Sequence, residues 1–252
     1  MNVAACAAIV EKGDPPRFRA TMAAPVAARE KLFPLLAFNV EVARAPWVTS
    51  EPGIAEIRLQ WWIEALEEIA AGGVIRQHEV TVPLAFQLTP EQARALIPLV
   101  EARNWDIYSD PHADQAALIT YLEQTSGRLM ALSAALLGQV GTEPAQAGGL
   151  ALGIANWLIA VPALKAAGRQ PLPDEGPQAI AALAESGLAA LARARKGAVV
   201  SAARPALYPL VDAGHVLGKA KRHPQAVLDG KLAPNPLGSH LRLMKAALTG
   251  RF

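Results

Sequence analysis

The sequence of 252 residues contains little cysteine and few aromatic residues, and both shortages limit the class of protein. Cys6 is the only cysteine, so the chain has no internal disulfide bond and no thiolate metal cluster. Aromatic residues make up 5% of the chain and β-branched runs are scarce, whereas hydrophobic residues, largely alanine and leucine, make up 52%. Alanine and leucine are strong helix formers. The composition therefore predicts an all-α protein rather than a β-sandwich or an α/β sheet.

Two segments of the sequence bear on targeting and on membrane insertion. The N-terminal segment MNVAACAAIVEKGDPP lacks the basic start of a signal peptide, and a cytoplasmic location is expected. Between Glu143 and Lys165, 21 residues are uncharged, which is long enough to span a membrane. Glycines, Asn156 and Pro162 dilute this run, so we interpret it as the buried central helix of a bundle.

Basic residues are concentrated at the C-terminal end of the chain. Residues 190–252 contain eleven Lys and Arg but only two Asp, although the formal net charge of the whole chain is +2. Such a region attracts anionic lipid or a phosphorylated ligand, and an ordinary solvated basic face is the alternative. We expect it to make peripheral contact with the inner membrane, and we expect no nucleic-acid partner.

Hydrophobic spacing and capping residues predict a series of helices with no long linker, and hence one domain over residues 1–252. Ser50 is the predicted N-cap of the second helix, and Gly72 its end. Thr89 and Gln92 have the spacing of a capping box. The predicted helices cover residues 24–44, 50–72, 90–108, 113–137, 143–167, 177–196, 198–204 and 238–249.

Several segments are similar, in order and spacing, to landmarks of squalene/phytoene synthase-like proteins. They are LLAFNVEVAR, EIRLQWWIEAL, LVEARNWDIY, YLEQTSGRLMAL and LGIANWLIAVPAL followed by GRQPLP, within about residues 15–175. AFNVEVAR and EIRLQWW most resemble the branch that contains the mitochondrial assembly factor for respiratory complex I and its proteobacterial relatives. The resemblance implies an all-α, isoprenoid-synthase-type helical bundle with a central cavity.

Catalytic members of this family condense two prenyl diphosphates, and they hold Mg²⁺ with aspartate clusters on two facing helices. The resemblance places the first cluster just after AFNVEV, where residues 43–47 read Ala, Arg, Ala, Pro and Trp. It places the second just after LGIANWLIA, where residues 161–165 read Val, Pro, Ala, Leu and Lys. Neither stretch contains an acid, so both Asp-rich magnesium motifs are predicted to be missing.

The resemblance therefore implies a non-catalytic protein that has no cofactor. Such a protein would assist assembly of respiratory complex I at the membrane. Its expected partner is a subunit of the complex or another assembly protein. Two alternatives stay open. One is an active, Mg²⁺-dependent prenyltransferase of the squalene/phytoene synthase type. The other is a protein that binds an isoprenoid or another lipid without converting it.

The family landmarks and the first two helices supply the candidate cavity-lining residues. We expect Glu41 to pair with Arg44 or another cation, and Arg58 to join Glu56 in a buried polar network. One of the adjacent tryptophans, Trp61 or Trp62, is expected to line the core or the cavity. The complete set is Glu41, Arg44, Arg58, Trp62, Asp106, Tyr121 and Arg128, of which Tyr121 and Arg128 are expected to point inward from one helix face.

A second acidic pattern, DIYSDPHAD, places Asp106, Asp110 and Asp114 four residues apart around His112. This spacing resembles a metal-binding face, but Pro111 prevents the three carboxylates from sharing one side of a helix. We interpret Asp110 as a helix N-cap, Asp114 as a first-turn acid and Asp106 as a buried residue. The five histidines of the chain show no spacing typical of metal ligands.

Overall fold

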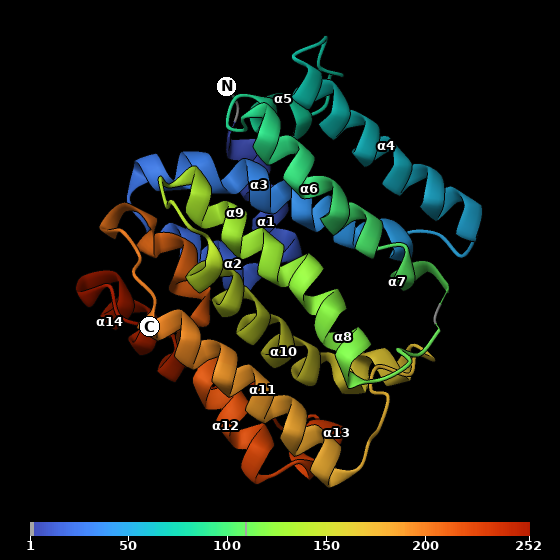
Figure 1. Cartoon of the computed structure of the whole chain (residues 1–252), viewed down its shortest axis with the longest axis vertical. Helices are drawn as coiled ribbons and strands as arrows, with labels where there is room; N and C mark the ends of the chain where they lie inside the picture. Colours follow the sequence, from blue (N-terminus) through green and yellow to red (C-terminus); the bar gives the residue numbers. More distant parts are fainter. Residues whose placement is uncertain (1–2, 109) are drawn as a thin grey trace.

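A computed structural model describes residues 3–108 and 110–252, and within these residues the protein consists of helices and connecting loops with no β-strand (Figure 1). The all-α prediction is confirmed. The elements are α1 (Val3–Gly13), α2 (Pro15–Met22), α3 (Val26–Arg44), η1 (Ala45–Trp47), α4 (Pro52–Ala71), α5 (Thr81–Ala85), α6 (Pro90–Ala102), α7 (Trp105–Tyr108), α8 (Gln115–Leu122), η2 (Glu123–Gly127), α9 (Arg128–Leu136), α10 (Glu143–Ala166), α11 (Pro177–Lys196), η3 (Ser201–Asp212), α12 (Ala213–Arg222), α13 (Gln225–Leu228) and α14 (Pro236–Thr249).

The central element is α10, which packs against α8, α9, η2, η3, α11, α12 and α13 (Figure 1). By length and mean hydropathy it is the one described helix able to cross a membrane, yet 61% of its most apolar window is buried by the protein itself. Gly149 permits a close approach between α10 and η2, because a Cβ atom there would lie 2.4 Å from the carbonyl oxygen of Ser126. The interpretation of this run as a core helix agrees with these contacts.

Several predicted helix boundaries match the structure. The ranges of α3, α11 and α14 agree with the predicted ones to within two residues. Thr89 and Gln92 form the predicted capping box, in which each side chain accepts a hydrogen bond from the other residue's backbone N–H. Gly72 ends α4 with a φ of 67°, a conformation that glycine adopts without strain.

Other boundaries were predicted wrongly. The N-cap of α4 is Glu51 rather than Ser50, it makes no side-chain capping bond, and Pro52 occupies the first helical position. Asp114, not Asp110, caps α8 by accepting a hydrogen bond from the Ala117 N–H at 2.8 Å. The helix predicted over residues 198–204 is instead the 3₁₀ segment η3, which contains Pro205 and Pro209 and continues to residue 212. The helix predicted to reach Tyr108 ends at residue 102.

The helix predicted over residues 113–137 runs through a π-helical segment, η2, between α8 and α9. A π-helical turn inserts an additional residue, so it rotates the following helix relative to the preceding one. Tyr121 lies before η2 and Arg128 lies after it, and the spacing of a regular α-helix no longer relates them. Sequence spacing alone gives no signal for this insertion.

Candidate functional site

A cluster of aromatic and charged side chains occupies the end of the bundle where η1, α7, α8 and α10 meet. We call it the tryptophan–arginine cluster. It brings together residues from four helical segments and three loops that are up to 122 positions apart. Its members are Trp47, Arg103, Trp105, Asp106, His112, Tyr121, Trp157 and Arg169.

The polar centre of the cluster is Asp106, which is 5% exposed. The hydroxyl of Tyr121 donates to its carboxylate at 2.9 Å, and Arg103 donates to the same carboxylate at 3.2 Å and to the Tyr121 hydroxyl oxygen at 2.7 Å. Burial raises the pKa of Tyr121, which keeps its proton for donation to Asp106. Arg103 and Asp106 thus form a nearly buried ion pair whose charges compensate each other.

Aromatic rings fill the space around this ion pair. Trp105 stacks on His112 with a centroid distance of 3.8 Å and an interplanar angle of 11°. Trp157, from α10, lies 5.6 Å from the ring of Tyr121 and 6.0 Å from that of Trp105. Burial lowers the pKa of His112, so its imidazole is neutral within the stack. Distances of 4.5–7 Å between centroids are those of favourable aromatic pairs.

The loop after α10 closes the cluster with Arg169. Its guanidinium donates to the backbone carbonyl of Asp106 at 2.6 Å and lies 4.6 Å from the ring centroid of Trp47. The indole N–H of Trp157 donates to the carbonyl of Pro171 in the same loop at 2.8 Å. These contacts join the segment after α3 to the end of α10. The resemblance had placed the two acid clusters in these segments.

The remaining space between these segments is very small. A cavity of about 10 Å³ is lined by Trp47, Leu164, Trp157, Arg169 and other members of the cluster. This is about the volume that one water molecule needs. Mg²⁺ bound to diphosphate needs clustered oxygen ligands and room for a much larger anion. The side chains present do not fit that group, because the lining contains one carboxylate, Asp106, which already binds Arg103 and Tyr121, and its other side chains are aromatic, aliphatic and cationic.

Two other carboxylates near these segments are engaged in ion pairs. Glu41 lies 3.4 Å from Arg44, and Glu175 lies 2.6 Å from Lys165. Among residues 3–108 and 110–252, no group of three or more His, Cys, Asp or Glu side chains is arranged to hold a metal ion. In particular, Asp110 and Asp114 are exposed while Asp106 is buried, so the DIYSDPHAD carboxylates do not converge.

Of the candidate cavity-lining residues, only Asp106 and Tyr121 meet in one site. Arg58 was assigned wrongly: it is exposed on the outer side of α4, and Glu56 accepts a hydrogen bond from Tyr108 rather than from Arg58. Arg44 is also exposed, and it does not face an enclosed space. Arg128 turns toward α6, where it donates to the Ala95 carbonyl at 3.2 Å.

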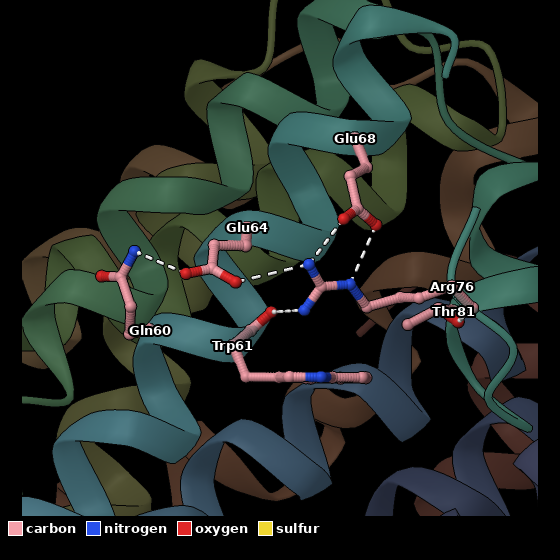
Figure 2. A network of polar contacts seen from close by, with 6 residues as sticks. All are labelled: Gln60, Trp61, Glu64, Glu68, Arg76 and Thr81. Carbon is pink, nitrogen blue, oxygen red and sulfur yellow. Dashed lines mark hydrogen bonds and ion pairs between the residues drawn. The ribbon is translucent and has the colours of Figure 1, made fainter. Parts of the chain in front are cut away.

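The two adjacent tryptophans of α4 serve different contacts. Trp62 is buried against Phe38 of α3 in an edge-to-face arrangement with centroids 5.4 Å apart. Trp61 lies beneath the guanidinium of Arg76, whose Cζ is 5.1 Å from the indole (Figure 2). Arg76 also bridges Glu68 at 2.5 Å and Glu64 at 3.3 Å. This network ties the loop after α4 back onto α4, and we assign it a structural role.

A second, much larger cavity lies on another face of α10. Its volume is about 630 Å³, within the roughly 300–1,000 Å³ typical of small-molecule sites. Aliphatic side chains such as Leu152, Ile159 and Val216 dominate its walls, and Arg17, Tyr208 and His240 contribute polar groups. It is enclosed by α2, α10, η3, α12 and α14. This cavity lies away from the tryptophan–arginine cluster, and none of the residues predicted to line a central cavity borders it.

Sequence reasoning identified Asp106 and Tyr121 of the cluster but missed the residues that fill it. Trp105, Trp157 and Arg169 fall inside the segments LVEARNWDIY, LGIANWLIAVPAL and GRQPLP. Their location in three family landmarks was a usable signal. If the three landmark segments lie side by side in the fold, side chains within them can contact one another. His112 carried no such signal, since its stacking on Trp105 depends on the path of the loop before α8.

Solved structures with the same chain path define the class of fold. The protein superposes on a dehydrosqualene synthase in complex with ligand with a TM-score of 0.81, at 15% identity, over 99% of this chain and 97% of the other. It superposes on squalene synthase HpnC from Alicyclobacillus acidocaldarius with a TM-score of 0.74, at 16% identity, over 89% and 94%. The fold is the isoprenoid-synthase helical bundle, as predicted. The sequence pattern of squalene/phytoene synthases matches residues 10–207, so the chain belongs to the squalene/phytoene synthase family.

Within that family, the chain is similar to a group of assembly factors. The human protein named NADH dehydrogenase (ubiquinone) complex I, assembly factor 6 is 27% identical over 139 residues, covering 53% of this chain and 40% of the human one. The mouse protein of that name is 26% identical over 166 residues, covering 62% and 48%. The matches thus span less than half the length of these relatives. The predicted family and branch are confirmed.

Proposed function

We propose that the protein is a non-catalytic member of the squalene/phytoene synthase family that assists assembly of respiratory complex I at a membrane. One observation carries the non-catalytic part: the space between η1 and the end of α10 is about 10 Å³ and is walled by Trp47, Trp157, Leu164 and Arg169. A prenyl diphosphate with its Mg²⁺ ions would have to displace these side chains and would meet no carboxylate cluster.

The assembly role is supported by the names of the relatives and not by the geometry of the site. Assembly factors bind folding or partly assembled subunits, and such work needs surfaces rather than a reaction centre. Acidic residues are in excess in the N-terminal part of the sequence and basic residues in the C-terminal part, and complementary charges of this kind guide protein association. The proposed location is the face of the inner membrane at which the complex is built, with a complex subunit or another assembly protein as partner.

A deletion strain tests this proposal. Loss of the gene is expected to lower NADH:quinone oxidoreductase activity in isolated membranes and to leave carotenoids and hopanoids unchanged, and the wild-type gene is expected to restore the activity. Unchanged oxidoreductase activity would contradict the assembly role. Loss of a carotenoid or hopanoid, together with turnover of radiolabelled farnesyl diphosphate by the purified protein, would favour the prenyltransferase alternative instead.

The cavity of about 630 Å³ favours a second candidate function, the binding of an isoprenoid or another lipid without conversion. Its walls are mostly aliphatic, and a hydrocarbon chain placed there would leave water at roughly 25 cal/mol for each Å² buried. Native mass spectrometry of protein purified from cells tests this function. A co-purifying isoprenoid or lipid of stable stoichiometry supports it, and protein that is uniformly free of ligand contradicts it.

A further inference from the structure

The C-terminal helix α14 exposes an apolar face to solvent. Leu237 is 76% exposed, Leu241 63%, Met244 45% and Leu248 87%. They are spaced by four, three and four residues, which places them along one side of the helix. We call these four residues the α14 stripe. Burial of large aliphatic side chains is normally favourable, so a stripe of this length indicates a surface that another body covers.

The stripe points away from the protein because the opposite side of α14 is firmly attached. Leu243 and Ala246 are buried against the bundle, and Arg242 donates to Asp212 of η3 at 2.7 Å. The helix ends at Thr249, and a Cβ atom at its C-cap, Gly250, would lie 2.5 Å from the side chain of Arg204. The exposed stripe is therefore a fixed feature of the folded protein.

Cationic groups flank the C-terminal end of the stripe. Lys245 on α14 and Arg251 just beyond it are exposed, and Arg195 at the end of α11 donates to the Phe252 carbonyl at 2.9 Å. This bond brings the basic last turn of α11, with Arg193, Arg195 and Lys196, beside the C-terminal end of α14. Asp212 is paired with Arg242, so it does not offset these charges.

The combination favours a bilayer over a second copy of this chain. A helix with leucines on one side and Lys and Arg at its borders is typical of helices that lie in a membrane interface. Anionic headgroups complement the cations, each at roughly 1 kcal/mol near the surface. Pairing two copies through the stripe would bring the same cations face to face in both partners, which is unfavourable.

We propose that the α14 stripe and its flanking cations dock the protein on an anionic phospholipid bilayer. The proposal deepens the membrane part of the proposed function and rests on it. Leu237 belongs both to the stripe and to the wall of the 630 Å³ cavity, together with His240 and Leu243 of the same helix. Docking through α14 thus places the rim of that cavity at the bilayer, where an apolar chain can pass without crossing water.

Flotation of the purified protein with vesicles tests the proposal. Wild-type protein is expected to float with vesicles of phosphatidylcholine and phosphatidylglycerol, to float less at high salt, and to remain behind with phosphatidylcholine alone. Leu241→Asp/Leu248→Asp is expected to reduce bound protein at least about tenfold, since both leucines leave the apolar interface. Lys245→Glu/Arg251→Glu is expected to remove the dependence on phosphatidylglycerol.

Ile57→Asp is the matched control, because Ile57 is an aliphatic residue 71% exposed on α4, outside the α14 stripe. It is expected to float like wild type, and circular dichroism checks that each variant is folded. Equal flotation of the leucine variant and wild type, or no flotation of wild type, would overturn the proposal. So would light scattering that shows a dimer dissolved by the leucine variant. The assay contains no respiratory complex, so its failure is separate from failure of the deletion test.

Discussion

Two faces of the same helix, α10, differ sharply in what they enclose. On one face, Trp157 and Leu164 belong to a packed cluster that leaves about 10 Å³. On the other, Ala155 and Ile159 border a cavity of about 630 Å³. The comparison indicates that this chain retains the helical framework of its family while the space between η1 and the end of α10 is closed by aromatic and cationic side chains. A cavity of ligand size lies instead on the other face of α10, and no group of three or more His, Cys, Asp or Glu among the described residues is arranged there to hold a metal ion.

The largest expected loss of stability comes from a substitution at the polar centre of the tryptophan–arginine cluster, on the packed face of α10. Asp106→Ala leaves the guanidinium of Arg103 without its counter-charge and Tyr121 without its acceptor. Breaking a buried ion pair in this way is expected to lower the free energy of unfolding by about 3–5 kcal/mol, measured by urea denaturation. Asp110→Ala, at an exposed position nearby, is the control and should change stability by about 0.5 kcal/mol or less. If Asp106→Ala lowered the free energy of unfolding as little as the control does, the buried ion pair would not stabilise the cluster.

The next largest expected loss of stability tests whether Trp157 packs in the interior of the tryptophan–arginine cluster. Trp157→Ala removes three aromatic contacts and the hydrogen bond to Pro171, and it is expected to cost about 3 kcal/mol in the same experiment. Trp47→Ala is expected to cost about 1 kcal/mol, because Trp47 is 45% exposed. Equal costs would show that the two tryptophans contribute alike and that Trp157 does not fill the interior.

The face of α10 that borders the 630 Å³ cavity is tested by placing a larger side chain in that cavity. Ile159→Trp projects an indole into the larger cavity and is expected to weaken binding of farnesol, an uncharged isoprenoid alcohol, by about tenfold, as measured by tryptophan fluorescence or calorimetry. Leu164→Trp adds the same side chain to α10 on the packed face and should leave farnesol affinity unchanged. If Leu164→Trp weakened binding and Ile159→Trp did not, the assignment of the two faces would be reversed.

The smallest expected effect concerns pH. Burial lowers the pKa of His112 below 6.5, so the unfolded chain binds a proton at His112 more readily than the folded chain does. His112 thus contributes stability above pH 6.5 that is lost as pH falls through 6.5 toward the lower pKa of the folded state. His112→Phe is expected to reduce this decline, which parallel urea titrations across that pH range would detect. An identical decline in both proteins would contradict the neutral, stacked imidazole.

Sequence reasoning reached the fold because helix signals are local. The capping box at Thr89, the glycine that ends α4 and the spacing within α3 depend on nearby residues, and they appear where they were predicted. Ser50 failed as a predicted cap because Glu51 and Pro52 already begin the helix. The π-helical segment η2 was missed because no local spacing in the sequence indicates the additional residue of a π-helical turn.

The candidate site was predicted less completely, for a related reason. Asp106 and Tyr121 were identified, but their partner Arg103 was missed, and Arg58 was placed inside although it is exposed. Whether an arginine on an amphipathic helix faces a cavity or solvent depends on the neighbours that cover it. The stacking of His112 on Trp105 joins residues on either side of a loop, and no periodicity encodes such a contact.

The most direct test of the central claim is calorimetric titration of the purified protein with a farnesyl thio-diphosphate analogue, with and without MgCl₂. The account predicts that Mg²⁺ adds no binding, because the space between η1 and the end of α10 is filled and lacks clustered carboxylates. Any binding should therefore depend on the farnesyl chain alone and should be weakened by Ile159→Trp. Saturable binding that requires Mg²⁺ and is abolished by a substitution at Leu164 would contradict the account.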